Sequence, residues 1–139
     1  MNEELIGPNL SFFDLSSRES LFSPEDALEG LLVSEKWLSS KFFYDQKGSE
    51  LFQKITELPE YYLTRAEIEI LDDNLDEISE LAGEDSALIE FGSGPSLKSR
   101  MLLKAIKPSI YMPLDISKAY LLETSKSLAS EFSSLEIKA

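Results

Sequence analysis

The sequence predicts a mixed α/β fold that contains the first part of a parallel, doubly wound sheet. Leu88–Phe91 is a short apolar run that ends at a turn with two glycines, and a helical pattern follows it. A second apolar run, Ile110–Leu114, ends at Asp115 and is again followed by a helical pattern. Strand, turn, helix and strand in this order are typical of βαβ units, whose strands lie parallel in one sheet.

An arm and a set of helices are expected before this sheet. Residues 1–22 contain apolar side chains without a regular period, and we expect them to form an arm that docks on the body. Ser23–Asp26 combines a serine cap, a proline at the first helical position and two acids, which predicts a helix start. A short helix is expected from Ser49. Its apolar side chains should face inward, at Leu51, Phe52 and Ile55.

The strongest helical pattern lies directly before the sheet. Thr64 is followed three residues later by Glu67, which predicts a capping box at the helix start. Apolar residues then recur at steps of three and four, at Ile68, Leu71, Leu75, Ile78 and Ala82. Gly83 is the expected C-terminal cap. We therefore expect an arm and a helical segment over residues 1–82, and the sheet over residues 83–139.

The sheet region contains two further helices and the start of a third strand. A helix is expected over Pro95–Ile106, and Pro108 ends it. Ser117 is the expected cap of the next helix. Leu135–Ile137 alternates apolar and polar residues as the opening of a strand does. The prediction is therefore a sheet with two to three parallel strands.

Composition limits the classes of protein to which this chain can belong. Hydrophobic residues make up 42% and charged residues 28% of the chain, which is typical of a globular domain. No apolar run approaches the roughly 18 residues of a membrane span, and the N-terminus lacks a signal-peptide pattern, so we expect a cytoplasmic protein without a membrane partner. The formal charge of −13 disfavours nucleic acid as a partner. No metal site is expected, since histidine and cysteine are absent.

The glycine turn carries the candidate ligand site. Gly92 and Gly94 can adopt backbone angles that are closed to other residues, and without Cβ atoms they allow a ligand to lie against the peptide. Free N–H groups at the start of the following helix can donate to a polar or anionic group. Asp115 is expected at the carboxyl end of the second strand, where an acid can accept hydrogen bonds from both ribose hydroxyls. This order predicts a nucleoside site.

A methyl donor fits this turn better than a dinucleotide. Leu97 replaces the third glycine of the dinucleotide pattern and Pro95 removes an N–H group, so a pyrophosphate would be held poorly. S-adenosylmethionine contains adenosine without phosphate, and Glu90 would favour its cationic sulfonium and amino groups. Two alternatives stay open: the glycine pair can be a tight turn without a ligand, and Asp115 can be a helix cap.

Several longer motifs extend beyond the glycine turn. The most specific is Leu58–Glu67, with the sequence LPEYYLTRAE. The others are Lys41–Asp45, Gly48–Phe52, Glu90–Gly94, Lys98–Arg100 and Pro113–Ser117. In this order and spacing the motifs resemble the histidine-specific N-alpha-methyltransferases of ergothioneine biosynthesis, which use S-adenosylmethionine. The resemblance extends over residues 25–139.

The resemblance implies roles for residues that periodicity does not place. Together with Glu90 and Gly94 of the turn, the residues expected to bind S-adenosylmethionine are Tyr61, Gly92, Lys98 and Asp115. The resemblance also implies that Tyr44 and Phe52 line the pocket of a small amino-acid acceptor, histidine in this family, and that Tyr44 orients the acceptor amine. The alternative for Tyr44 and Phe52 is packing in the core.

The family fold is Rossmann-like, and this chain is expected to hold only its first part. A sheet that stops after two strands and the start of a third leaves an unpaired edge and an uncovered apolar helix face. We therefore expect a partial chain that keeps much of the donor site, lacks most of the acceptor site and binds without turnover. A missing C-terminal portion or a second copy would complete it. The alternative function is a non-catalytic, self-associating or regulatory remnant of the family.

Overall fold

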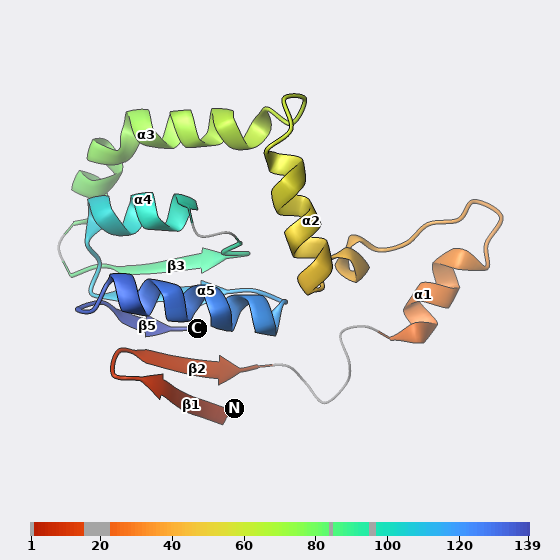
Figure 1. The fold of residues 1–139 in the computed structure, drawn as a ribbon, viewed down its shortest axis with the longest axis horizontal. Coiled ribbons are helices and arrows are strands. Elements are labelled where there is room, and N and C mark those ends of the chain that lie inside the picture. Colours follow the sequence, from red (N-terminus) through yellow and green to blue (C-terminus); the bar gives the residue numbers. More distant parts are fainter. Residues whose placement is uncertain (1, 16–22, 84, 95–96) are drawn as a thin grey trace.

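A five-stranded sheet organises the chain, whose computed structural model describes residues 2–15, 23–83, 85–94 and 97–139. The strands are β1 (Asn2–Gly7), β2 (Leu10–Asp14), β3 (Ala87–Phe91), β4 (Ile110–Leu114) and β5 (Glu136–Lys138). Their order in the sheet is β1-β2-β5-β4-β3, and only β1 and β2 pair antiparallel. The expected parallel strands are thus confirmed as β3, β4 and β5, and the N-terminal arm adds two more (Figure 1).

Two crossover helices cover one face of the parallel strands. Helix α4 (Leu97–Ile106) joins β3 to β4, and α5 (Lys118–Glu131) joins β4 to β5. The predicted start of α4 at residues 95 and 96 lies outside the described residues. The buried apolar cluster is formed by Leu10, Phe12, Leu103, Tyr111, Leu121, Leu128, Leu135, Ile137 and Ala139. The core therefore lies between this helical layer and the sheet.

The longest helix packs beside α4. Helix α3 (Leu63–Ala82) ends at Gly83, whose φ is 72° and whose N–H donates to the Ser79 carbonyl, as predicted. The predicted capping box is wrong, because Tyr62 is the N-cap residue and Thr64 lies inside the first turn, where its hydroxyl caps nothing. The Ser79 hydroxyl donates to the Ala105 carbonyl at 2.9 Å and thereby links α3 to the end of α4.

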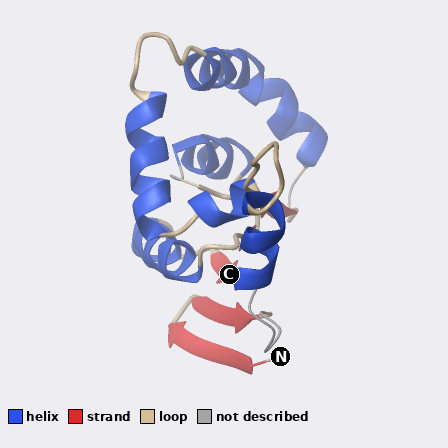
Figure 2. Cartoon of the chain, turned by 90° about the vertical axis from the view of Figure 1, so that its right-hand side faces the viewer, coloured by secondary structure: helices blue, strands red, loops and turns tan. Residues whose placement is uncertain are grey.

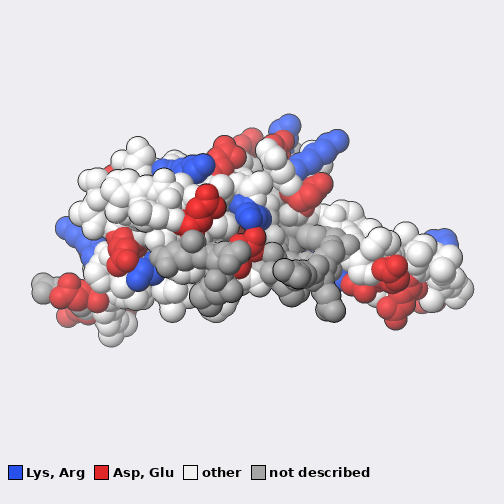
Figure 3. Space-filling view, turned by 90° about the horizontal axis from the view of Figure 1, so that it is seen from below, with Lys and Arg blue, Asp and Glu red and all other residues white. Residues whose placement is uncertain are grey.

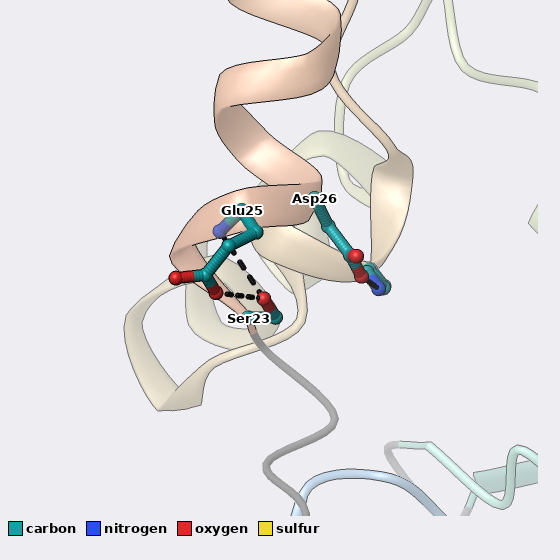
Figure 4. A network of polar contacts seen from close by, with 4 residues as sticks. Ser23, Glu25 and Asp26 are labelled. Carbon is teal, nitrogen blue, oxygen red and sulfur yellow. Dashed lines mark hydrogen bonds and ion pairs between the residues drawn. The ribbon is translucent and has the colours of Figure 1, made fainter.

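The first helix begins as its sequence predicts. In α1 (Pro24–Leu31) the Ser23 hydroxyl accepts the Glu25 N–H at 3.1 Å and donates to the Glu25 carboxylate (Figure 4). The hydrogen bond from the Ser23 hydroxyl lowers the pKa of the Glu25 carboxyl group. A bond from the backbone N–H of Glu25 to its own carboxylate acts in the same direction. Asp26 pairs with Lys41, which ties α1 to the short helix η1 (Ser40–Phe43). Figure 1 shows α1 well away from the sheet.

The next helix differs from its prediction in two ways. Helix α2 (Gln46–Thr56) begins three residues before Ser49, because Asp45 accepts the Gly48 N–H at 2.7 Å and caps it. Its apolar side chains do not face a core. Leu51, Phe52 and Ile55 are 49%, 40% and 42% exposed. Helix α2 is amphipathic as expected, but the described residues cover its apolar face only in part.

The N-terminal arm is a β-hairpin that extends the sheet beyond β5. Strand β2 pairs parallel with β5, with Leu10 opposite Ile137, and Leu10 and Phe12 are buried. At the hairpin turn, the Asn9 side-chain amide donates to the carbonyls of Ala129, Phe132 and Leu135 at 3.2, 3.1 and 3.0 Å. Docking of the arm is thus confirmed, and Figure 2 shows the hairpin at the outer side of the fold.

The opposite edge of the sheet is open, as the sequence predicted. Strand β3 pairs with β4 alone among the described strands. On the sheet face that α4 and α5 do not cover, Ile89 is 53% exposed and Phe91 is 84% exposed. The neighbouring β4 side chains on that face, Met112 and Leu114, are only half-buried. An apolar sheet surface therefore reaches solvent beside an unpaired strand edge.

Replacing Asn9 with alanine should destabilise the fold. The substitution removes the donor to three carbonyls at the end of α5 and before β5, so the free energy of unfolding should fall by about 2 kcal/mol. Urea unfolding measures this change. Asn74→Ala is the matched control, since the Asn74 amide donates to one carbonyl of its own exposed helix. An equal effect of both substitutions would contradict the role of Asn9.

Candidate functional site

The glycine turn has the geometry that the sequence predicted. Gly92 and Gly94 have φ angles of 67° and 46°, which place both in the left-handed region. The N–H groups of Gly92 and Ser93 donate to the Leu114 carbonyl at 2.7 and 3.4 Å, so the end of β4 holds the turn. A Cβ atom built at Gly92 meets nothing within 4 Å. The turn therefore leaves open space against its backbone.

Asp115 lies beside this turn because of the sheet register. Phe91 of β3 is opposite Leu114 of β4, so the two strands end at the same level. The residues that follow them therefore lie side by side at the carboxyl end of the sheet. Oδ1 of Asp115 accepts the Ser117 N–H at 2.8 Å, which is the local capping contact that the alternative interpretation expected. Oδ2 of Asp115 has no hydrogen-bond partner in the described part of the chain. One oxygen thus orders the loop before α5, and the other can accept from a ligand.

Glu90 lies two residues before Gly92 and is held by buried hydroxyl groups. Its Oε2 atom accepts from the Tyr111 hydroxyl at 2.5 Å and from the Ser99 hydroxyl at 2.8 Å. Tyr111 and Ser99 are both 0% exposed. Burial raises the pKa of Tyr111 well above its ordinary value, and the bond to Glu90 adds to this shift. The phenol therefore stays a donor over the ordinary pH range.

Lys98 contacts a helix and not the glycine turn. Its Nζ atom pairs with Oε1 of Glu67 at 2.7 Å, and both side chains are exposed. Glu67 belongs to α3, so this ion pair links the start of α4 to the start of α3. Exposed pairs of this kind contribute little stability, and Lys98 can leave Glu67 at small cost.

The aromatic residues divide into a pair and a separate side chain. Phe52 of α2 and Tyr61, in the connection to α3, form an edge-to-face contact with ring centroids 5.9 Å apart and an interplanar angle of 84°. Tyr44 follows η1 and is 45% exposed, without a ring contact to this pair. Tyr44 and Phe52 are both exposed in this structure and lie outside its buried apolar cluster. Figure 1 shows α2 beyond the arrowhead of β3, on the side of the glycine turn.

The described surface is hollowed elsewhere. One hollow of about 330 Å³ lies between α4 and the segment after α5, and one of about 260 Å³ lies at the hairpin turn. Neither is lined by a predicted site residue. The candidate site instead lies in the open at the carboxyl ends of the strands, where it is formed by the turn after β3 and the loop after β4. An enclosed pocket would require further polypeptide over this edge.

Sequence reasoning missed two of the residues that surround this edge. Tyr111 and Ser99 were expected only as parts of a strand and a helix, yet both bind the carboxylate of Glu90. The pattern gave one weak signal, since Glu90, Ser99 and Tyr111 are polar residues within otherwise apolar elements. Only the packing of α4 across β3 and β4 brings the three together.

The surface charge is mixed on the face seen in Figure 3. Lysine and arginine side chains lie apart from one another and beside acidic side chains there. Arg100 and Lys104 both pair with Glu131, at 2.6 and 3.1 Å, and these contacts lower the pKa of Glu131.

Within the described residues, no helix combines the length and the apolar composition that crossing a bilayer requires.

Comparison with known proteins identifies relatives of the whole region that contains this edge. Residues 23–139 match the model of a family described as histidine-specific methyltransferase, SAM-dependent. The chain is 43% identical over 118 residues to histidine N-alpha-methyltransferase of Mycobacterium tuberculosis. The matched region covers 82% of this chain and 36% of that protein. It is 35% identical over 109 residues to ergothioneine biosynthesis protein 1 of Neurospora crassa, covering 76% of this chain and 12% of that protein.

A third relative is named for a different acceptor. The chain is 32% identical over 128 residues to 4-dimethylallyltryptophan N-methyltransferase of Claviceps purpurea, covering 88% of this chain and 37% of that protein. The chain thus spans only about a third of the length of the bacterial relative, 36%, and of this fungal relative, 37%. The matched part contains the glycine turn, Asp115 and the aromatic residues of α2 and the following connection.

Substituting Gly92 with alanine should strain the turn without a clash. An L-residue in the left-handed region costs about 1 kcal/mol, and this should appear in the free energy of unfolding. Gly7→Ala is the control, because an added Cβ there also meets nothing within 4 Å but φ is not positive. A Gly92→Ala protein as stable as the Gly7→Ala protein would contradict the turn geometry.

Tyr111 should make the fold sensitive to alkaline pH. Its pKa is raised in the fold, so the unfolded chain releases the phenolic proton first, and stability should fall as pH rises above about 10. Urea unfolding near pH 8 and near pH 10.5 measures this loss. Tyr111→Phe should reduce the difference between the two pH values, and an unchanged difference would contradict the prediction.

Proposed function

The chain belongs to the family of SAM-dependent, histidine-specific methyltransferases, and we propose that it forms the donor-binding part of such an enzyme. S-adenosylmethionine is the methyl donor of this family. In this proposal the adenosine part of the donor lies along the turn at Gly92 and Gly94, and Asp115 accepts hydrogen bonds from the ribose. The chain spans about a third of its curated bacterial relative, 36%, so the complete reaction needs polypeptide beyond the matched part.

One observation carries the donor site. Gly92, at φ 67°, leaves its backbone open, and Oδ2 of Asp115 has no described partner. The two lie together at the carboxyl end of the sheet because Phe91 and Leu114 are in register. A ligand with a flat base and a ribose diol needs both a close backbone approach and a carboxylate acceptor. The end of the sheet at Gly92 and Asp115 supplies both.

The chemistry in the complete enzyme is methyl transfer to an amine. The donor supplies an electrophilic methyl group on a sulfonium. A neutral amine nitrogen attacks the methyl carbon, the C–N bond forms as the C–S bond breaks, and the ammonium product then loses a proton to solvent. Such a step depends on a dry site and on close, in-line placement of the two reactants more than on acid or base groups.

The acceptor is proposed to be the amino group of an amino acid, with histidine as the first candidate. Two of the three relatives named above are a histidine and a 4-dimethylallyltryptophan N-methyltransferase, and both of these names describe amino-acid acceptors. Exposed Phe52 and half-buried Tyr61 form an aromatic pair that suits a planar side chain, and Tyr44 would orient the amine. Lys98 would turn from Glu67 to the donor when the latter binds.

The part that completes the site is proposed to dock on the open side of the sheet. Strand β3 has a free edge, and Ile89 and Phe91 present apolar surface next to it. A polypeptide equivalent to the unmatched two thirds of the relatives would cover this surface and enclose the donor. A self-associating remnant is the second candidate, since the same surface favours contact between two copies.

Calorimetry with S-adenosylhomocysteine tests the donor site. The chain should bind this product with saturable heat, and Asp115→Asn should weaken binding about tenfold because a neutral amide accepts weaker hydrogen bonds from the ribose. Asp76→Asn, on the exposed side of α3, makes the same change in charge and should leave binding unaltered. Absence of saturable heat up to millimolar ligand, in a folded sample, would overturn the proposal.

Sedimentation over a range of protein concentrations separates the two candidates for the open surface. Self-association should appear as a mass that rises with concentration, and Phe91→Ser should reduce it because the largest exposed ring on this face is lost. Leu81→Ser is the matched control, since Leu81 is 80% exposed on α3 and Phe91 is 84% exposed. A monomer at every concentration would contradict the proposal of a self-associating remnant. The proposal of a donor-binding part would then stand alone.

A further inference from the structure

The carboxylate of Glu90 is held in one orientation by two hydroxyl groups from different elements. The hydroxyl of Tyr111, on β4, donates to Oε2 at 2.5 Å, and the hydroxyl of Ser99, on α4, donates to the same atom at 2.8 Å. Both donor residues are 0% exposed, whereas Glu90 is half-buried. A rigid, fully buried pair of donors therefore fixes a side chain that reaches toward solvent.

The charge of this carboxylate is not balanced within the described chain. Glu90 forms no ion pair with any described lysine or arginine, and its Oε1 atom has no hydrogen-bond partner among the described residues. Both hydroxyl groups donate to a carboxylate that no described lysine or arginine accompanies. A half-buried carboxylate without a cation is costly unless a cation of another molecule completes it.

The place of Glu90 indicates which cation this is. Glu90 lies at the end of β3, two residues before Gly92, where the backbone leaves open space. The methyl donor carries an ammonium group on its amino-acid part, and the proposed site places the donor along this turn. The adenosine part alone has no positive charge and would gain nothing from Glu90.

We propose that Tyr111 and Ser99 are positioning residues that hold Glu90 toward the ammonium group of the methyl donor. The inference rests on the proposed donor site and adds two residues to it. Neither hydroxyl touches the ligand. Their action is to occupy Oε2, so that Oε1 alone is left to accept from the ligand, and to keep the side chain from rotating when the ligand is absent.

Two ligands separate this role from simple stabilisation of the fold. S-adenosylhomocysteine carries the ammonium group, and 5′-methylthioadenosine has the same nucleoside and thioether without the amino-acid part. Calorimetry should show that Tyr111→Phe and Ser99→Ala each weaken S-adenosylhomocysteine binding about five- to tenfold. Binding of 5′-methylthioadenosine should change less than about twofold. The ratio of the two dissociation constants is the readout.

Ser125→Ala is the matched control for Ser99→Ala. Ser125 is also 0% exposed on a helix, but its hydroxyl has no hydrogen-bond partner among the described residues, so its removal should leave both dissociation constants unchanged. Where Tyr111→Phe fails to fold, Ser99→Ala carries the test, because it removes a single oxygen.

The outcomes are distinct. An unchanged ratio, or an equal loss for both ligands, would overturn the positioning role and leave the donor site standing. Failure of the unsubstituted chain to bind either ligand would overturn both proposals.

Discussion

The parallel register of β3 and β4 is the constraint on which the candidate site depends. With Phe91 opposite Leu114, the two strands end at the same level, and the Leu114 carbonyl accepts the N–H groups of Gly92 and Ser93. A shift of the register by one residue would place Glu90 and Tyr111 on opposite faces of the sheet and move the glycine turn relative to Asp115. The hydrogen-bond ladder thus determines both the backbone opening and the carboxylate beside it.

The two edges of the parallel part of the sheet differ in whether another strand pairs with them. On the β5 side the N-terminal hairpin adds two strands, and Asn9 satisfies the carbonyls at the end of α5, so this edge of the parallel sheet is paired. On the β3 side the ladder stops at the strand that carries the glycine turn. The family match begins at residue 23 and does not include the hairpin. The two strands added beyond β5 are therefore built by residues outside the family region, and the unpaired edge of β3 lies within it.

The distribution of apolar surface follows the same division. Residues between the sheet and the helices α4 and α5 are buried, among them Leu103, Tyr111 and Ile137. Residues that face away from these helices, such as Phe91, and those on the apolar side of α2, such as Phe52, are exposed. Both exposed groups border the edge where a donor and an acceptor would meet. Polypeptide that covered them would also exclude water from that edge, which methyl transfer requires.

Local sequence determined the elements whose signals lie within one turn or one strand. The glycine turn, the strand Ile110–Leu114 and the cap at Gly83 formed as predicted, because each depends on backbone preferences and on a short apolar pattern. The capping box at Thr64 failed since a competing start at Tyr62 preceded it. Only tertiary structure decided that the arm became a hairpin on β5, that α2 remained uncovered, and that Tyr111 and Ser99 met at Glu90. These outcomes depend on contacts between residues far apart in the chain, and a pattern of local residues contains no information about such contacts.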